Sequence, residues 1–236
     1  KERDIEIVKT FIDAFKVNVR EKGAFAAKSN IKVLFKPTPN DPNINSIARN
    51  LNIDLEGKHP KQKKDIYNTV EEDFVQNLDM IYEETLKSKE WIGSDIWRFF
   101  KYDAKDLTII NDDSFRNILV ILTDGYIYHN GTVRKSNNRS SFLTNKFLKN
   151  IDIYDNSDWK SYLETNDYGL ISVGQKLENL EVLFLEINPI DEYIIDEEII
   201  RWYVSNWLQD MKVKDFRIYN TALIPNTKTR INNFLK

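Results

Sequence analysis

The chain has 236 residues, of which 41% are hydrophobic and 30% charged, and its formal net charge is -3. This mixture is typical of a globular α/β protein that buries a sizeable core. Lys and Arg are dispersed along the sequence, so no basic stripe is available to follow a nucleic-acid backbone. No apolar run approaches the roughly 18 residues that span a bilayer. The absence of cysteine excludes disulfides, thiolate metal sites and cysteine nucleophiles.

The N-terminal region combines an unusual start with a helical pattern. The chain begins at Lys1 rather than Met, which slightly favours a trimmed signal or lipoprotein leader, and hence an extracytoplasmic over a cytoplasmic location. Apolar side chains recur at helical spacing over residues 5–20, which predicts an amphipathic helix that ends near Gly23. We expect residues 1–29 to form a helical extension that packs on a domain spanning residues 30–236.

The rest of the chain alternates strand and helix patterns. Apolar, β-branched runs predict four strands, at residues 31–35, 117–122, 180–187 and 216–219. Helical periodicity predicts long helices over residues 64–87 and 193–211. Strands that alternate with helices indicate a Rossmann-like fold, in which a mainly parallel central sheet carries helices on both faces. The run 117–122 has no polar alternation, which predicts a central strand of that sheet.

Three local features give sharper expectations. Asn130-Gly131 lies between two β-prone segments, which predicts a type I′ hairpin that pairs residues 126–128 with residues 132–134. Trp207 should be buried on the helix face that also carries Ile200, Tyr203 and Met211. The basic run at residues 61–64 begins a helix and should be solvated.

A polar turn, Thr123-Asp124-Gly125, follows the apolar run 117–122. Ligands of open parallel sheets bind outside the carboxyl ends of the strands, and Gly125 lets the chain turn there without a Cβ penalty. The segment ILVILTDG resembles the end of the fourth strand in the von Willebrand factor A family, and the resemblance covers roughly residues 30–235. It implies a von Willebrand factor A-like fold, protein–protein contact at this edge, and a metal-ion-dependent adhesion site that includes Asp124.

The first strand departs from the family pattern. The family's Asp-x-Ser-x-Ser positions align with residues 36–40, where Lys36 replaces the leading carboxylate while Thr38 and Asn40 keep oxygen atoms. The ammonium of Lys36 repels a divalent cation, so the resemblance implies a degenerate adhesion site without a cofactor. We expect Lys36 to pair with Asp124, because both residues follow strands that should be neighbours. The expected site comprises Lys36, Thr38, Asn40, Ser94 as the counterpart of the family's loop threonine, Asp124 and Gly125.

Two classes of function fit these observations. The favoured one is a non-enzymatic protein-binding or scaffold module, with Tyr126 and Tyr128 as partner contacts. The chain has no Gly-rich phosphate loop and no G-x-S-x-G elbow, which makes an enzyme the less favoured reading. The alternative is a hydrolase in which carboxylates such as Asp124 and Glu186 bind Mg²⁺ or another divalent ion. If the adhesion site itself held a metal ion, its ligands would be Asp124, Thr38 and Ser94. A simpler interpretation is that Asp124 only caps the segment that follows it.

Overall fold

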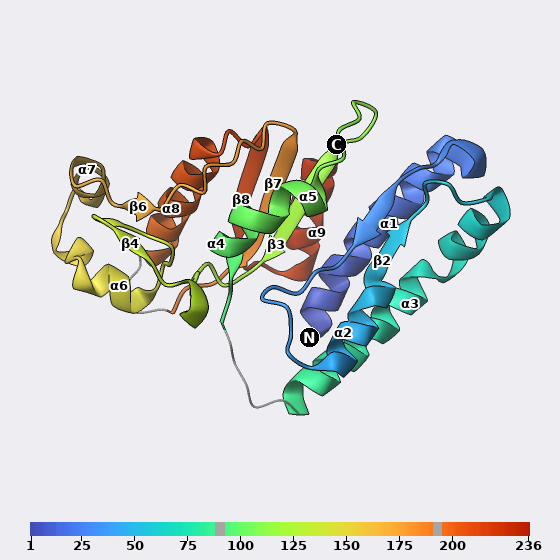
Figure 1. Ribbon diagram of the computed structural model, residues 1–236, viewed down its shortest axis with the longest axis horizontal. Helices are drawn as coiled ribbons and strands as arrows, with labels where there is room; N and C mark the ends of the chain where they lie inside the picture. Colours follow the sequence, from blue (N-terminus) through green and yellow to red (C-terminus); the bar gives the residue numbers. More distant parts are fainter. Residues whose placement is uncertain (88–92, 191–194) are drawn as a thin grey trace. The chain divides into compact units, whose positions relative to one another are not determined.

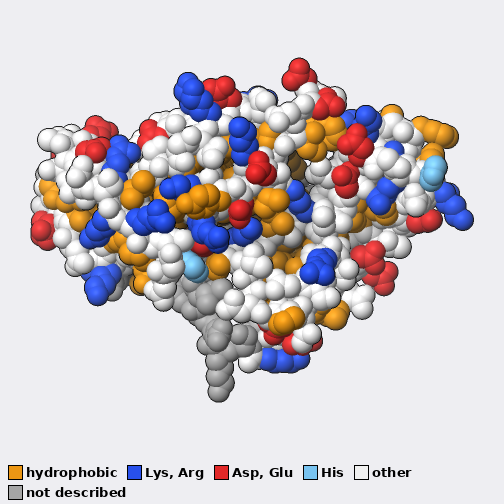
Figure 2. All heavy atoms as spheres, in the orientation of Figure 1, with side chains coloured by type: hydrophobic (Ala, Val, Ile, Leu, Met, Phe, Trp, Pro, Cys, Tyr) orange, Lys and Arg blue, Asp and Glu red, His pale blue; other side chains and the backbone are white. Residues whose placement is uncertain are grey.

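The computed structural model describes residues 1–87, 93–190 and 195–236, which form a mixed α/β fold (Figure 1). The chain divides into two compact units. Unit 1 combines Lys1–Trp91 with Ala222–Lys236, and unit 2 spans Ile92–Thr221. The boundary expected between residues 29 and 30 falls inside unit 1. Both signs of charge occur on the visible face of each unit, with apolar side chains between them (Figure 2).

Unit 1 is mainly helical. Its core lies between the long helices α1 and α3, where Ile12, Val70 and Phe74 are fully buried. The predicted helices over residues 5–20 and 64–87 are confirmed, and α3 begins at Pro60, a residue suited to the first turn of a helix. The elements of this unit are α1 (Glu2–Ala26), β1 (Asn30–Lys32), α2 (Pro42–Ala48), η1 (Arg49–Leu51), β2 (Asn52–Asp54), α3 (Pro60–Lys87) and α9 (Ile224–Leu235).

The first predicted strand is wrong in extent and in pairing. Only Asn30–Lys32 is extended, and it pairs antiparallel with β2, with Ile31 opposite Ile53. Residues 31–35 are therefore not part of the parallel sheet. The apolar run belongs instead to the core of unit 1, where Ile31, Val33 and Phe35 pack. An apolar run shows that a segment is buried, but it does not say against which partner.

Lys63 corrects the expectation of a solvated basic run. Its side chain is buried, with an exposed fraction of 5%. The ammonium donates to the carbonyl oxygen of Ala27 at 2.5 Å, just beyond the end of α1. A cation at the end of a helix satisfies carbonyl groups that have no partner within the helix, so Lys63 joins α3 to the end of α1.

Unit 2 contains the parallel sheet. Three predicted strands are confirmed in it as β3 (Asn117–Leu122), β7 (Leu180–Ile187) and β8 (Asp215–Asn220), in the order β3-β7-β8. The expectation that residues 117–122 form the central strand is wrong, because β3 lies at one edge and β7 in the middle. All residues of β7 except Glu186 are buried, whereas most of β3 is only partly buried.

Short elements surround this sheet. A second, small sheet has the order β4-β5-β6, in which β5 runs antiparallel to β4 and parallel to β6. The longest helix of unit 2, α8 (Asp196–Asp210), connects β7 to β8. The remaining elements are α4 (Ile96–Arg98), the π-helical turn η2 (Phe99–Asp103), α5 (Ala104–Thr108), η3 (Asn130–Thr132), β4 (Lys135–Ser136), β5 (Arg139–Ser140), α6 (Asn145–Asn150), η4 (Ile153–Asp155), α7 (Trp159–Thr165) and β6 (Gly169–Leu170).

The hairpin predicted around Asn130-Gly131 is wrong. Residues 130–132 form the 3₁₀ turn η3, and Gly131 does not adopt a positive φ. The flanking residues find other partners, since Tyr128 pairs with Ser94 and Ile127 with Leu143. The tight turn lies further along the chain, between β4 and β5, where Asn137 has a φ of 53°. Asparagine accepts this left-handed conformation more readily than most residues.

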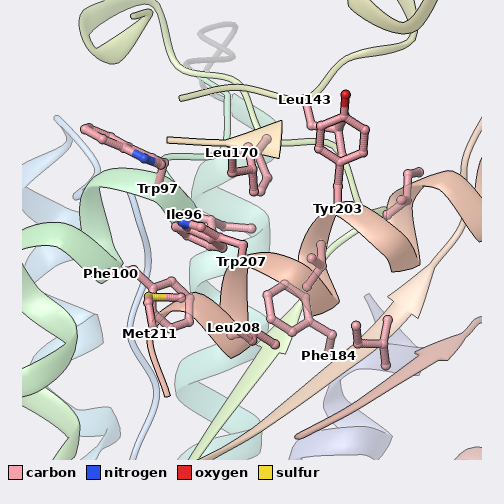
Figure 3. Close-up of a cluster of buried hydrophobic side chains, with 14 of the residues drawn as sticks. Ile96, Trp97, Phe100, Leu143, Leu170, Phe184, Tyr203, Trp207, Leu208 and Met211 are labelled. Atoms are coloured by element: carbon pink, nitrogen blue, oxygen red, sulfur yellow. The ribbon is translucent and has the colours of Figure 1, made fainter. Parts of the chain in front are cut away.

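The apolar face of α8 forms the centre of the unit 2 core. Trp207 is 1% exposed, and Ile200, Tyr203 and Met211 are fully buried, as predicted. Figure 3 shows Trp207 and Tyr203 projecting from α8 into a cluster that includes Phe184 of β7. The helix begins at Asp196. Residues 193 and 194, which the prediction included, lie outside the described residues.

A buried carboxylate joins the three strands at the amino end of the parallel sheet. Glu181, in β7, is 5% exposed. It accepts hydrogen bonds from Arg116 Nε and Nη2, at 2.9 and 2.7 Å, and from Lys214 Nζ at 3.1 Å. Arg116 precedes β3 and Lys214 precedes β8. Burial opposes ionisation of Glu181, but the hydrogen bonds from both cations outweigh it and lower the pKa of the carboxyl group.

Replacing this carboxylate should make stability depend less on pH. Because the pKa of Glu181 is lower in the folded state than in the unfolded state, its contribution is complete above the ordinary carboxyl range and is lost as the pH falls through the folded-state pKa. Glu181→Gln should therefore lower the free energy of unfolding at pH 7 by about 1.5–3 kcal/mol. Urea unfolding across the acidic range would measure the difference from the parent.

The difference should begin to shrink in the ordinary carboxyl range, where the unfolded state takes up a proton, and should vanish below the lower folded-state pKa, where the folded parent is also protonated. Glu178→Gln is the matched control, because Glu178 is exposed and lies 3.7 Å from Lys212. Equal stability of Glu181→Gln and the parent at pH 7 would contradict the role assigned to Glu181. A difference in the free energy of unfolding that stays constant into strong acid would contradict it as well.

Candidate functional site

The Thr123-Asp124-Gly125 turn lies at the carboxyl edge of the parallel sheet, directly after β3. Two backbone hydrogen bonds hold it to the end of β7, from Thr123 N to Leu185 O at 3.2 Å and from Asn188 N to Asp124 O at 2.9 Å. The Asp124 carboxylate accepts the N–H of Tyr126 at 2.9 Å, and the residue is exposed. The turn therefore presents an ordered carboxylate to solvent. The bond to Tyr126 also agrees with a capping role for this side chain.

Gly125 allows α8 to approach the turn. Its φ is 103°, and a Cβ atom at this position would lie 2.8 Å from Ile200 Cγ2 and 3.3 Å from Ile187. A side chain here would strain the backbone and collide with the helix. The glycine predicted from the sequence as a turn residue therefore also has a packing role.

A second segment joins this edge through Ser94. Ser94 N donates to Tyr128 O at 2.8 Å, and Tyr128 N donates to Ser94 O at 3.2 Å. The close approach depends on Gly93, with a φ of 86°, because a Cβ atom there would lie 2.2 Å from Tyr128 O. Ser94 is thus placed beside the segment that follows the Thr-Asp-Gly turn.

A polar network next to this pairing connects residues that are far apart in the sequence. Asp95 is 3% exposed, and its Oδ1 accepts the hydroxyl of Thr132 at 2.9 Å. Its Oδ2 lies 3.6 Å from His129 Nδ1 and 3.9 Å from Arg98 Nη1. The network ties η3 to the start of α4. His129 is partly buried in it, and no local sequence pattern predicts a contact between residues 95 and 132.

The two tyrosines expected to contact a partner have different surroundings. Tyr126 packs its ring against the core of unit 2. Burial, more than any other influence, raises the pKa of its hydroxyl. Tyr128 is partly exposed, and its hydroxyl donates to Asn130 at 2.5 Å. Tyr128 therefore offers more surface to a partner than Tyr126 does.

The predicted adhesion site is divided between the two units. Lys36, Thr38 and Asn40 follow β1 in unit 1, whereas Ser94, Asp124 and Gly125 belong to unit 2. The reasoning that placed Lys36 next to Asp124 is wrong in one step, because β1 is not a neighbour of β3 in the parallel sheet. The pairing of these two side chains stays a prediction.

The described residues offer no cluster of metal ligands. Within residues 1–87, 93–190 and 195–236, no group of three or more His, Asp and Glu side chains is arranged to hold a metal ion. Glu186, named for the hydrolase alternative, lies at the irregular end of β7 with a φ of 71°. Across these same ranges, no helix has the length and apolarity needed to cross a membrane.

No protein family, curated protein or solved structure matches this chain. Function is therefore inferred from the residues of the chain and their geometry.

A matched pair of glycine substitutions tests the packing of the turn. Gly125→Ala should destabilise the protein by about 2–4 kcal/mol, because it adds both backbone strain and a collision with Ile200. Gly174 has a similar φ of 72° but no atom within 4 Å of its Cβ position, so Gly174→Ala should cost only about 1 kcal/mol. Chemical denaturation of both variants measures the difference. Equal losses would show that α8 does not constrain residue 125.

Proposed function

We propose that unit 2 is a non-enzymatic protein-binding module that uses the carboxyl edge of its parallel sheet. This surface, the Asp124 edge, comprises Ser94, Asp124, Gly125, Tyr126 and Tyr128. The observation that carries the proposal is the exposed Asp124 carboxylate, which the Tyr126 N–H orients at the end of β3. Open α/β sheets bind ligands at this position.

The proposal includes a von Willebrand factor A-like relationship for unit 2. Its support is the order of elements, in which the strand that ends in Thr-Asp-Gly is followed by a parallel neighbour, a helix and a further parallel strand. Lys36 aligns with the family's leading carboxylate in sequence only, since it belongs to unit 1 and follows a strand outside the parallel sheet. The site proposed for unit 2 therefore includes no carboxylate from a first strand and acts without a metal ion. The fold alone does not define the function. Binding is proposed from the residues of the Asp124 edge.

The chemistry of the edge favours a particular kind of partner. Asp124 supplies an exposed negative charge, and Tyr128 supplies a partly exposed aromatic ring. Aromatic residues are enriched in the centres of protein interfaces, and complementary charges orient the two partners. A protein that presents a Lys or Arg side chain next to apolar surface fits this edge best.

Site-specific photo-crosslinking tests the proposal. A benzoylphenylalanine residue in place of Tyr128 should form a discrete crosslinked product with one partner protein in cells that produce the chain. Adding Asp124→Asn should remove most of that product, because the carboxylate orients the partner. Gel electrophoresis and mass spectrometry identify the product.

Tyr102 provides the matched control, because it is an exposed tyrosine in η2, outside the Asp124 edge. The same photo-reactive residue at position 102 should not give the product. Identical products from both positions would contradict the proposal. Calorimetric Mg²⁺ binding that Asp124→Asn abolishes would instead support the metal-dependent hydrolase.

A further inference from the structure

A surface pocket of unit 2 shares no residue with the Asp124 edge. Its volume is about 290 Å³, and its lining includes Gly169 and Leu170 of β6. The walls come from the end of α7, the last turns of α8, and Arg139 of β5. This volume lies just below the range of about 300–1,000 Å³ that is typical of small-molecule sites, so an occupant would be no larger than an amino acid.

The pocket offers aromatic surface. Trp202 and Tyr168 line it and are partly buried. Trp207 contributes from the core, and its indole N–H is already bonded to Ile171 O at 3.2 Å. The rings of Trp202 and Tyr168 offer contact area, which suits an alkyl chain or a cation held against an aromatic face.

The charged groups of the pocket are unequal in number. Its lining has three carboxylates, on Glu164, Asp167 and Asp210, and one guanidinium, on Arg139. Arg139 Nε and Nη2 donate to Asp167 at 2.9 and 2.8 Å. Arg139 Nη1 donates to Asp210 at 3.3 Å and to Leu170 O at 3.4 Å. All three guanidinium nitrogens are therefore engaged, and the pocket keeps a negative excess.

The position of the remaining carboxylate strengthens this excess. Glu164 lies in the last turn of α7 and is exposed, and its side-chain carboxylate forms no ion pair or hydrogen bond with the described residues. The last turn of α8, which forms another wall, contains Asp210 and no basic residue. The carboxyl end of a helix carries partial negative charge and is stabilised by a cation. Arg139 Nη1 already lies 3.3 Å from Asp210 at this end of α8, so the negative excess of the pocket rests mainly on the Glu164 carboxylate.

Asp167 fixes the position of the guanidinium in the pocket. Asp167 lies two residues beyond the end of α7 with a φ of 52°, a conformation that aspartate accepts more readily than most residues. Its side chain holds Arg139, and the hydrogen bond from this guanidinium lowers the pKa of Asp167.

We propose that this pocket binds a small organic cation, an alkyl amine or diamine. One ammonium group lies beside Glu164 and the carboxyl end of α8, and the alkyl chain lies against Trp202 and Tyr168. Side-chain amides of Asn206 and Gln209, which also line the pocket, can accept hydrogen bonds from the ammonium. An anionic ligand is disfavoured, because the single guanidinium is already engaged by two carboxylates.

Isothermal titration calorimetry with cadaverine tests the proposal. Cadaverine should bind with one-to-one stoichiometry, and 1,5-pentanediol, its neutral analogue, should not bind at the same concentrations. Glu164→Gln should weaken cadaverine binding about five- to tenfold, in line with a partly solvated ion pair next to an aromatic surface. Since Glu164 is exposed and unpaired, this variant should fold like the parent.

Glu178→Gln is the matched control, because Glu178 is an exposed carboxylate of unit 2 outside the pocket. It should leave cadaverine affinity unchanged. Trp202→Leu, which removes the aromatic face and keeps apolar volume, should also weaken binding. Saturation by pentanediol or inorganic phosphate would overturn the proposal, as would equal effects of the two glutamate substitutions or no binding of cadaverine.

Discussion

Strand β7 is the constraint on which the rest of unit 2 depends. It is hydrogen-bonded to a parallel strand on each side, and all of its residues except Glu186 are buried. Backbone polar groups in such a strand must find partners within the protein, because water cannot reach them. The registers of β3 and β8 are therefore both set by β7. Its irregularity between Phe184 and Ile187, where Glu186 has a φ of 71°, ends the regular pairing with β8.

Both ends of β7 carry polar groups that connect fold to function. At the amino end, Glu181 binds Arg116 and Lys214 and so joins all three strands. At the carboxyl end, Asn188 donates to the backbone oxygen of Asp124 and positions the turn after β3. The helix α8, which follows β7, then packs Ile200 against Gly125. The location of the Asp124 edge is thus a consequence of the sheet, not of the turn sequence alone.

The sequence predicted those elements whose signal is local. Three parallel strands, the long helices α3 and α8, and the burial of Trp207 were all evident from periodicity and apolar content. The order of strands was not, because NILVIL and LEVLFLEI look alike until their partners are known. Asn130-Gly131 carried a hairpin signal, but contacts of Tyr128 with Ser94 and of Ile127 with Leu143 overrode it.

The candidate sites also divide into those that local sequence predicts and those that depend on tertiary contacts. The turn at Asp124 was predicted, since its residues are consecutive, follow an apolar run and need only local geometry. The pairing of Lys36 with Asp124 required two strands to be neighbours, and β1 instead pairs with β2 in unit 1. The pocket beside Trp202 draws Arg139, Glu164 and Asp210 from three separate elements. No sequence motif predicts this pocket, because only the tertiary structure brings these residues together.

Native-state hydrogen exchange of the sheet amides tests the central role of β7 most directly. The amides of Val182 and Phe184 should exchange only through global unfolding, and more slowly on average than those of β3, because every interior amide of β7 faces a strand on one side or the other. Exchange from β7 that is faster than exchange from β3 would contradict the account.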